Sequence, residues 1–331
     1  MRRSYIDIGA NMLDEMYQGV YHGHASHAPD VDAVLERAHA RGVTHLIVTA
    51  GTVEETAAGV AFCAARAGRA GTPELYSTAG VHPTRCSSLG AADVAALAAT
   101  VAAHGRHVGG RVVALGEMGI DHDRLQFCPA AAQAAGFEAQ LRGLAGPGAA
   151  ALPLPLFLHY RGAPATAGTA FFDVLQRTRG LWGARGGVVH SFTGTADDVA
   201  RVLALGLAVS VNGVSFRTRE GIAASTLVPA DRLLLETDAP WCDIRPTHPS
   251  HALLQAARAR LLAQADDADA PDLAPIPTCR RDRFREGCAV KGRNEPATIP
   301  DVLLVAAEAR HEDPTVLAQQ AYNNTISMFF S

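Results

Sequence analysis

The feature that most constrains the fold of this 331-residue chain is the regular alternation of short apolar runs with helix-period segments. Eight runs have the length of β-strands, and most of them are apolar at every position rather than at every second one. Continuous apolar strands are typical of parallel sheets that are covered on both faces. The runs are residues 5–9, 45–51, 75–82, 111–117, 155–160, 186–192, 206–213 and 233–240.

Segments with helical periodicity lie between these runs. The first of them, residues 30–42, begins with acidic residues and ends at Gly42, which is a typical helix stop. The others are residues 53–68, 91–104, 130–145, 165–179, 195–205, 299–309 and 313–329. Strands that alternate with helices indicate βαβ units, and eight such strands are the number in a (β/α)8 TIM barrel. We therefore expect an α/β protein of this fold class.

We expect a single TIM-barrel domain over residues 1–331, because α/β barrels of this length fold as one unit. Residues 143–155 are expected to form a loop. The stretch 243–298 shows the least helix–strand alternation and is predicted to be a loop insertion, basic and turn-rich over 279–296. Two interpretations of this insertion stay open, a plain surface loop and a lid or substrate-contact loop.

Composition narrows the class of protein. A net charge of −4 argues against a basic nucleic-acid coat but leaves room for a local positive groove. The six cysteines are scattered without a Cys-x-x-Cys pair, which favours reduced thiols. No apolar run approaches the length of a membrane span, so no membrane association is expected. We expect an intracellular protein of the cytoplasm, nucleus or mitochondrion, and nothing in the sequence requires a protein partner.

Acidic and imidazole side chains lie in or at the ends of these apolar runs. They are Asp7, His82, Glu117, His159, His190 and Asp238. A barrel gathers the carboxyl ends of its strands on one face, so these residues are expected to meet there. One such histidine alone is usually a hydrogen-bonded structural residue. A whole set suits a divalent metal, and a cation would explain the buried charge of Glu117.

Six segments, in order, resemble the signatures of the TatD-type metal-dependent deoxyribonucleases. They are IDIGAN, STAGVHPTRC, ALGEMGIDHDRLQFCP, LFLHYR, GGVVHSFTGT and LLLETDAPWC, and GRNEP and AYNNTISMFF also fit. The likeness covers residues 5–330, and DRLQFCP resembles the eukaryotic subgroup in particular. It implies an amidohydrolase-like TIM barrel that hydrolyses phosphodiester bonds of DNA, typically from the 3′ end.

The resemblance also implies roles for individual residues. Glu117, His159, His190 and Asp238 match the family's metal ligands, and Glu117 and Asp238 are expected to be catalytic, with Asp238 orienting a metal-activated water. His82 and Arg161 are expected to bind the substrate. His82 would contact a phosphate or a water, and Arg161 would pair with a phosphate, with a surface ion pair as the alternative for Arg161.

One segment departs from the family pattern. Many relatives begin with Asp-x-His-x-His, whereas Gly9 and Asn11 stand at the two histidine positions here. We expect one metal site built on Glu117, His159 and His190. A second site would use Asp238 and Glu117 with Asp7 or Asn11, and such an oxygen-rich site suits Mg²⁺ or Mn²⁺ better than Zn²⁺.

The expected function is metal-dependent hydrolysis of DNA, as a 3′–5′ exonuclease on single-stranded DNA with one or two divalent ions. Mg²⁺ or Mn²⁺ is expected, with Zn²⁺ as the alternative. Activity should fall at acidic pH, where metal-binding imidazoles protonate, and with added salt. Candidate backbone contacts are Arg124, Arg161 and the basic residues 280–293. Alternatives are a hydrolase of an ester, amide or acyl-nucleic-acid substrate, and a non-catalytic nucleic-acid-binding relative.

Overall fold

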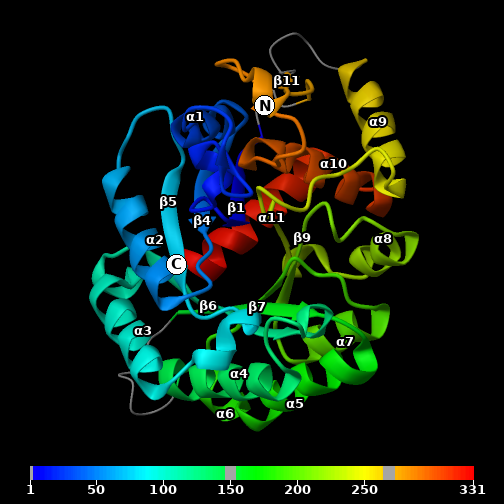
Figure 1. Cartoon of the computed structure of the whole chain (residues 1–331). Coiled ribbons are helices and arrows are strands. Elements are labelled where there is room, and N and C mark those ends of the chain that lie inside the picture. The colour runs from blue at the N-terminus through cyan, green and yellow to red at the C-terminus, as the bar shows by residue number, and fades with distance from the viewer. Residues whose placement is uncertain (1–2, 146–153, 264–272) are drawn as a thin grey trace. The chain divides into compact units, whose positions relative to one another are not determined.

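The main sheet of the protein contains eight strands that follow one another in chain order (Figure 1). The structure is a computed structural model that describes residues 3–145, 154–263 and 273–331. The strands are β1 Tyr5–Ala10, β4 Val43–Val48, β5 Glu74–Ala79, β6 Val112–Asp121, β7 Leu156–Arg161, β8 Gly187–His190, β9 Ala208–Val211 and β10 Leu233–Leu235. The first and last of them, β1 and β10, contact each other. This arrangement confirms the predicted (β/α)8 TIM barrel.

The chain forms two compact units, each with its own core. The first comprises Met1–Leu46, Gly68–Glu74 and Val211–Asn324, and the second comprises Ile47–Ala67, Leu75–Ser210 and Thr325–Ser331. The core of the first unit includes the buried side chains of Ile8, Leu35 and Leu303. The core of the second unit includes those of Leu115, Phe157 and Val189.

Helices accompany the strands in both units. Those of the first unit are α1 Val31–Ala40, α8 Arg219–Thr226, α9 Pro249–Leu262, α10 Ile299–Arg310 and most of α11 Pro314–Phe329. Those of the second unit are α2 Val53–Ala65, α3 Ala91–His104, α4 Ala130–Ala145, α5 Thr169–Arg177, α6 Arg179–Trp182 and α7 Ala196–Ala204. Within the second unit, α4 and α5 lie along β6 (Figure 1).

Local sequence explains where several helices begin. Thr195 and Asp198 form a capping box at the start of α7, where each side chain accepts a hydrogen bond from the other's backbone N–H. Thr52 caps α2 by accepting a hydrogen bond from the Glu55 N–H at 3.1 Å. These side chains satisfy backbone donors that have no partner within the first turn of a helix.

The predicted helices are found close to their expected bounds, with two differences. The predicted helix 165–179 is divided into a π-helical turn at Pro164–Gly168, then α5 and α6. In addition, α8 and α9 were not predicted, and α9 lies inside the stretch 243–298 that was expected to be a loop. The buried face of α9 consists of Ser250, Leu254 and Ala257, so its apolar periodicity is weak.

Residues 143–145 of the predicted loop 143–155 belong to α4, and most of the remainder lies outside the described residues, which resume at 154. The extent of a single domain over 1–331 stays a prediction. Among the described residues, no helix combines the length and the apolar character that crossing a membrane requires.

Candidate active site

Glu117 lies inside β6 rather than at the end of a strand, where the sequence analysis expected it. The strand continues to Asp121 because two glycines let it run close to β7: a Cβ on Gly119 would lie 1.9 Å from the carbonyl oxygen of His159, and one on Gly116 would lie 2.0 Å from that of Phe157. The pairing of β6 with β7 changes register between Leu115 and Met118, the segment that carries Glu117.

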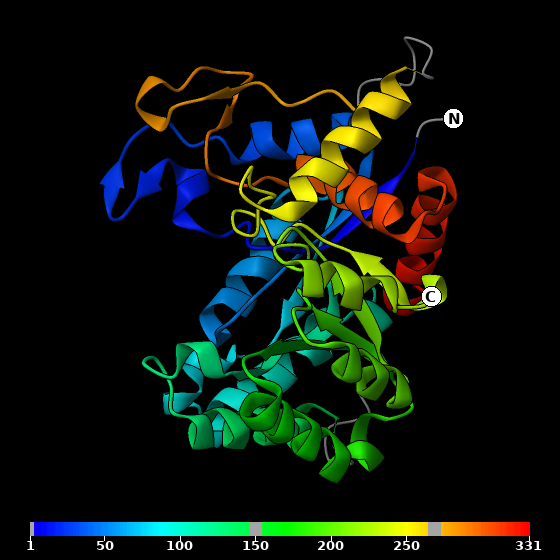
Figure 2. The same cartoon turned by 90° about the vertical axis from the view of Figure 1, so that its right-hand side faces the viewer.

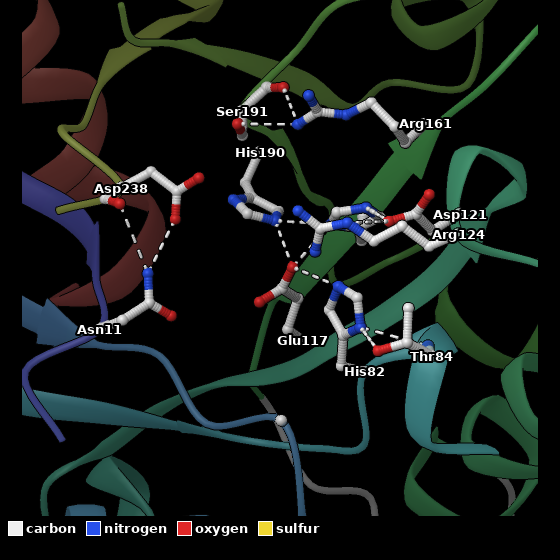
Figure 3. A network of polar contacts seen from close by, with 12 residues as sticks. Asn11, His82, Thr84, Glu117, Asp121, Arg124, Arg161, His190, Ser191 and Asp238 are labelled. Carbon is white, nitrogen blue, oxygen red and sulfur yellow. Dashed lines mark hydrogen bonds and ion pairs between the residues drawn. The ribbon is translucent and has the colours of Figure 1, made fainter. Parts of the chain in front are cut away.

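Strand register brings two of the predicted histidines together. His159 of β7 pairs with His190 of β8, and on its other side His159 pairs with Gly119 of β6. The side chains of both histidines reach one oxygen of Glu117, and Figure 3 shows this contact for His190. The Oε1 atom of Glu117 lies 2.6 Å from Nδ1 of His159 and 2.7 Å from Nε2 of His190, and these two nitrogens are 3.3 Å apart.

Glu117 and the neighbouring Asp121, at the end of β6, are both held in the charged form. Burial by itself raises the pKa of Glu117, but the His190 and His82 imidazoles and hydrogen bonds with His159 and His190 hold it well below its usual range. Burial also raises the pKa of Asp121, and the hydrogen bond with His159 and the charge of that ring outweigh this effect and lower it. Two buried carboxylates among imidazole rings form a site that attracts a cation.

Asp121 is a member of the cluster that the sequence analysis did not assign. It is 1% exposed, and its Oδ2 lies 3.3 Å from Nε2 of His159, so His159 contacts one carboxylate with each ring nitrogen. A carboxylate in this position fixes the orientation and the basicity of a metal-binding imidazole. The signal was present in the sequence, because Asp121 follows Glu117 by four residues and therefore has the same parity in an extended strand.

His82 also joins the cluster, from a position beyond the end of β5. It caps the 3-10 helix η2 (Pro83–Ser88), and its Nδ1 accepts a hydrogen bond from the Thr84 N–H at 3.2 Å. Its Nε2 lies 3.5 Å from Oε1 of Glu117. Burial lowers the pKa of His82 to about 3, so the ring is neutral and its hydrogen is on Nε2. The ring therefore acts as a donor toward Glu117 or toward a substrate oxygen.

The donor set fits a divalent metal. Ligand atoms of His82, Glu117 and His159 lie within 4.8 Å of one another, and His190 contacts the same carboxylate oxygen as His159. Imidazole nitrogen with carboxylate oxygen is a common set for Zn²⁺, Mn²⁺ and similar ions. The predicted ligands Glu117, His159 and His190 are thus brought together, while their role as ligands stays a prediction.

Asp238, the fourth predicted ligand, lies in the first unit, three residues beyond the end of β10. Its backbone is left-handed, with a φ of 52°, and its N–H donates to the carbonyl of Gly9 at 2.8 Å. The amide nitrogen of Asn11 donates to Oδ1 of Asp238 at 2.9 Å (Figure 3). Cys242 Sγ lies 3.1 Å from the other oxygen. Asn11 thus orients Asp238 through a hydrogen bond.

Asp7 was expected to be an alternative ligand of a second metal site, and its hydrogen bonds argue against that role. Its Oδ1 accepts hydrogen bonds from the backbone N–H groups of Thr237 and Gly9, at 3.0 and 3.2 Å, and its Oδ2 accepts one from the Thr237 hydroxyl at 2.5 Å. The side chain is fully buried. Both oxygens therefore stabilise the connection between β1 and the segment that follows β10.

Arg161, a predicted phosphate contact, stands on the same strand as His159. The two residues are two positions apart on β7 and so point to the same face. Its guanidinium donates to the carbonyl and the hydroxyl of Ser191, at 3.3 and 3.1 Å, directly after His190 (Figure 3). Arg124 lies 3.8 Å from Asp121 and is largely exposed. Both cations therefore lie beside the histidine–carboxylate cluster.

Clustered histidines and carboxylates on the strands of a (β/α)8 barrel define the class of TIM-barrel proteins with a candidate metal site. Comparison with known proteins gives the family. The TatD related DNase family matches residues 21–330. The chain therefore belongs to this family, as the sequence motifs predicted. The matched range begins after Gly9 and Asn11, the positions at which the chain departs from the common motif.

Individual relatives agree over nearly the whole length. Deoxyribonuclease Tat-D of Schizosaccharomyces pombe is 34% identical over 330 residues, which cover 98% of this chain and 95% of that protein. The 3′-5′ ssDNA/RNA exonuclease TatD of Cronobacter sakazakii is 32% identical over 326 residues, covering 98% and 97%. The crystal structure of an uncharacterized amidohydrolase from Saccharomyces cerevisiae has a TM-score of 0.86 at 29% identity, covering 99% of this chain and all of the other.

Proposed function

We propose that this protein is a divalent-metal-dependent deoxyribonuclease that removes nucleotides from the 3′ end of single-stranded DNA. The observation that carries the proposal is the convergence of His159 Nδ1 and His190 Nε2 on one oxygen of the ionised Glu117, inside the barrel of a TatD-family chain. The relatives from S. pombe and C. sakazakii, named a deoxyribonuclease and a 3′-5′ ssDNA/RNA exonuclease, support the substrate and the direction of cleavage.

Different residues of the chain would bind the metal and position the attacking water. Glu117, His159 and His190 would hold a divalent ion, with Asp121 orienting His159 through its second nitrogen. A bound ion supplies Lewis-acid activation of the scissile phosphate and of the attacking water. Asp238, oriented by Asn11, would hold this water and accept its proton. Mg²⁺ or Mn²⁺ is proposed, as one or two ions, with Zn²⁺ as the alternative.

Substrate binding is assigned to donors beside the cluster. His82 carries its ring hydrogen on Nε2 because Nδ1 accepts from Thr84, which suits it to a phosphate oxygen. Arg161 is held by Ser191 and offers a planar, permanently charged group for the same purpose. Since these contacts involve backbone phosphates, affinity should fall steeply as the salt concentration rises.

The test is digestion of a single-stranded oligonucleotide labelled at its 5′ end. The metal-stripped protein should be inactive, and Mg²⁺ or Mn²⁺ should restore a ladder of labelled products that shortens stepwise. Duplex DNA and RNA of the same sequence, run in parallel, give the preference among nucleic acids. Products cut first at internal positions would overturn the exonuclease assignment.

Two variants separate the site from its surroundings. Glu117→Gln should lose cleavage, because it removes the charge that two imidazoles contact. Glu138→Gln, which alters an exposed carboxylate paired with Arg142 and Arg177 on the surface, should keep it. If the protein binds Mn²⁺ but cleaves no nucleic acid with any metal, the nuclease proposal is wrong and an ester or amide becomes the proposed substrate.

We also propose an intracellular location. None of the six cysteines, all of which lie among the described residues, forms a disulfide, and four of them are buried. This pattern favours a reducing compartment, and the cytoplasm, nucleus and mitochondrial matrix all provide one. Imaging of the tagged chain in cells tests the proposal, and secretion of the protein into the medium would contradict it.

A further inference from the structure

A cavity of about 740 Å³ lies within the first unit and has no role in the mechanism above. Two segments far apart in the sequence line it, residues 14–22 and residues 280–292, together with Trp241. Figure 2 shows the first segment in blue beside the second in orange. Its volume is in the range of pockets that bind small molecules, about 300–1,000 Å³.

A short two-stranded ribbon carries the basic side of this cavity. Strand β11 (Thr278–Cys279) pairs with β12 (Ala289–Val290) in parallel, and the Lys291 N–H donates to the carbonyl of Cys279 at 2.8 Å. Arg280 and Arg281 directly follow β11, and Lys291 directly follows β12. Because the strands are parallel, these cations emerge at the same end of the ribbon.

Trp241 provides an aromatic surface on a fixed backbone. Its side chain is 54% exposed, whereas the only other tryptophan, Trp182, is fully buried. The backbone N–H of Trp241 donates to the carbonyl of Asp238 at 3.0 Å, and the backbone carbonyl of Trp241 accepts from the Asn294 side chain at 2.7 Å. An exposed indole on a tethered loop is positioned to bind a flat ligand without ordering costs in the chain.

The three cations that line the cavity differ in whether a carboxylate of the protein already pairs with them. Arg280 forms two hydrogen bonds of 2.9 Å with Asp282. The guanidinium of Arg281 lies 5.2 Å from the ring centre of Tyr21, a cation–π contact. In the part of the chain that the structure describes, neither Arg281 nor Lys291 pairs with a carboxylate. These two cations therefore keep their capacity for an anion.

Besides Asp282, which pairs with Arg280, two acidic residues line the cavity and set limits on its ligand. Asp14 accepts a hydrogen bond from the Met16 N–H at 2.9 Å and so caps the 3-10 helix η1 (Glu15–Gln18), while Glu15 is exposed. Carboxylates suit the amino groups of bases and the hydroxyls of sugars, and repel phosphate. The ligand must therefore place an anion against Arg281 and Lys291, beside a flat and hydrogen-bonding body.

We propose that this cavity binds one nucleotide of a single-stranded nucleic acid, with the base stacked on Trp241 and a backbone phosphate held by Arg281 and Lys291. The inference rests on the proposed function and extends it with a substrate subsite. Stacking on an aromatic side chain tolerates any base, because every base has a π-face. The subsite should therefore add affinity without sequence preference.

Trp241 offers a direct readout of binding. The full chain, kept in a chelator so that no cleavage occurs, is titrated with a ten-nucleotide oligothymidylate while tryptophan fluorescence is recorded. Since Trp182 is buried, quenching reports on Trp241. We expect saturable quenching that Trp241→Phe abolishes, and Trp241→Ala should weaken binding at least about fivefold. Quenching that persists in Trp241→Phe, or an unchanged affinity, would overturn the subsite.

Lys291 allows a second and independent measurement, because it is the only lysine in the chain. Acetylation of Lys291, followed by mass spectrometry, should be slowed by the oligonucleotide. Lys291→Ala should raise KM for single-stranded DNA and leave kcat unchanged. The slope of the logarithm of the binding constant against the logarithm of the salt concentration should become shallower by about 0.7. Arg142→Ala, an exposed change on α4, is the matched control and should leave both constants unchanged.

The outcomes distinguish the two proposals. If the wild-type chain cleaves DNA while Lys291→Ala and Trp241→Ala keep the wild-type KM, the subsite is wrong and the nuclease assignment stands. If the chain binds the oligonucleotide with quenching but cleaves nothing with any metal, the nuclease assignment is wrong and the subsite stands.

Discussion

Hydrogen-bond direction at His82 assigns it a different role from His159, although both approach the same carboxylate. Nδ1 of His82 accepts from a backbone N–H, so its free nitrogen carries a hydrogen. Each nitrogen of His159 instead faces a carboxylate, Glu117 on one side and Asp121 on the other. The two carboxylates orient the His159 ring so that a metal can replace a hydrogen on it, whereas His82 must first lose its bond to Thr84.

This difference predicts distinct effects of two substitutions. His159→Ala should weaken Mn²⁺ binding at least about tenfold. His82→Ala should change it by less than about threefold and should instead raise KM for single-stranded DNA. Calorimetric titration with Mn²⁺ and steady-state hydrolysis separate the two effects. An equal loss of Mn²⁺ affinity in both variants would make His82 a metal ligand.

Asp7 predicts a pH dependence of stability that is independent of catalysis. Burial raises its pKa to about 8, against hydrogen bonds from Thr237 and Gly9 that lower it. The folded state therefore binds a proton that the unfolded chain releases near pH 4. The contribution of Asp7 to the free energy of unfolding is complete below about pH 4 and is lost as the pH rises to about 8.

The comparison of wild type with Asp7→Asn isolates this effect. Asparagine keeps the shape and the acceptor for the two backbone N–H groups but does not titrate. As the pH rises from 5 to 8, the thermal midpoint of the wild type should fall relative to that of Asp7→Asn. A difference that is constant across this range would show that Asp7 does not change its protonation on folding.

At the scale of elements, the close approach of β6 to β7 determines where His159 stands. Gly119 has a φ of 152° and faces the backbone of His159, where a side chain has no space. Gly119→Ala should therefore lower the free energy of unfolding by about 3 kcal/mol, and it should also weaken metal binding because His159 must shift. Denaturant unfolding and Mn²⁺ titration measure the two losses.

A glycine in open surroundings provides the control for that experiment. A Cβ on Gly180 of α6 meets nothing within 4 Å. Gly180→Ala should leave stability unchanged or raise it by up to about 1 kcal/mol, as expected for this change in a helix. If Gly119→Ala is as harmless as Gly180→Ala, the contact between β6 and β7 does not position the site.

At the scale of the whole molecule, a buried ion network joins two segments that are far apart in the sequence. Arg293 is fully buried in its side chain and contacts Asp30 at 2.6 Å and Glu295 at 2.9 Å. Arg37 of α1 contacts the same Glu295 at 2.9 Å. The network thus ties the α1 region to residues that follow β12, more than 250 positions later, inside one compact unit.

Removal of the central cation should be costly, because two carboxylates would remain buried without it. Arg293→Met is expected to lower the free energy of unfolding by about 3 to 5 kcal/mol. Arg142→Met, which breaks an exposed ion pair on α4, should change it by less than about 1 kcal/mol. Urea denaturation of both variants measures the difference, and equal effects would argue against the structural importance of the network.

Much of the architecture follows from local patterns in the sequence. The apolar runs predicted all eight barrel strands, and α3 and α4 have the predicted bounds, because apolar periodicity and capping residues act over a few positions. By contrast, α9 buries mostly small residues and was missed. The motif residues Glu117, His159 and His190 are likewise recognisable from the sequence alone.

The sequence by itself determined the fold class, the family and the residues Glu117, His159 and His190 of the histidine–carboxylate cluster, since these depend on residue types and their order along the chain. Only the tertiary structure decided that Glu117 lies inside a strand, that Asp121 joins His159, that Asn11 donates to Asp238, and that Trp241 shares a cavity with Lys291. Those facts depend on strand register and on the direction of hydrogen bonds between distant segments. Such contacts form when the chain packs, and no local pattern encodes them.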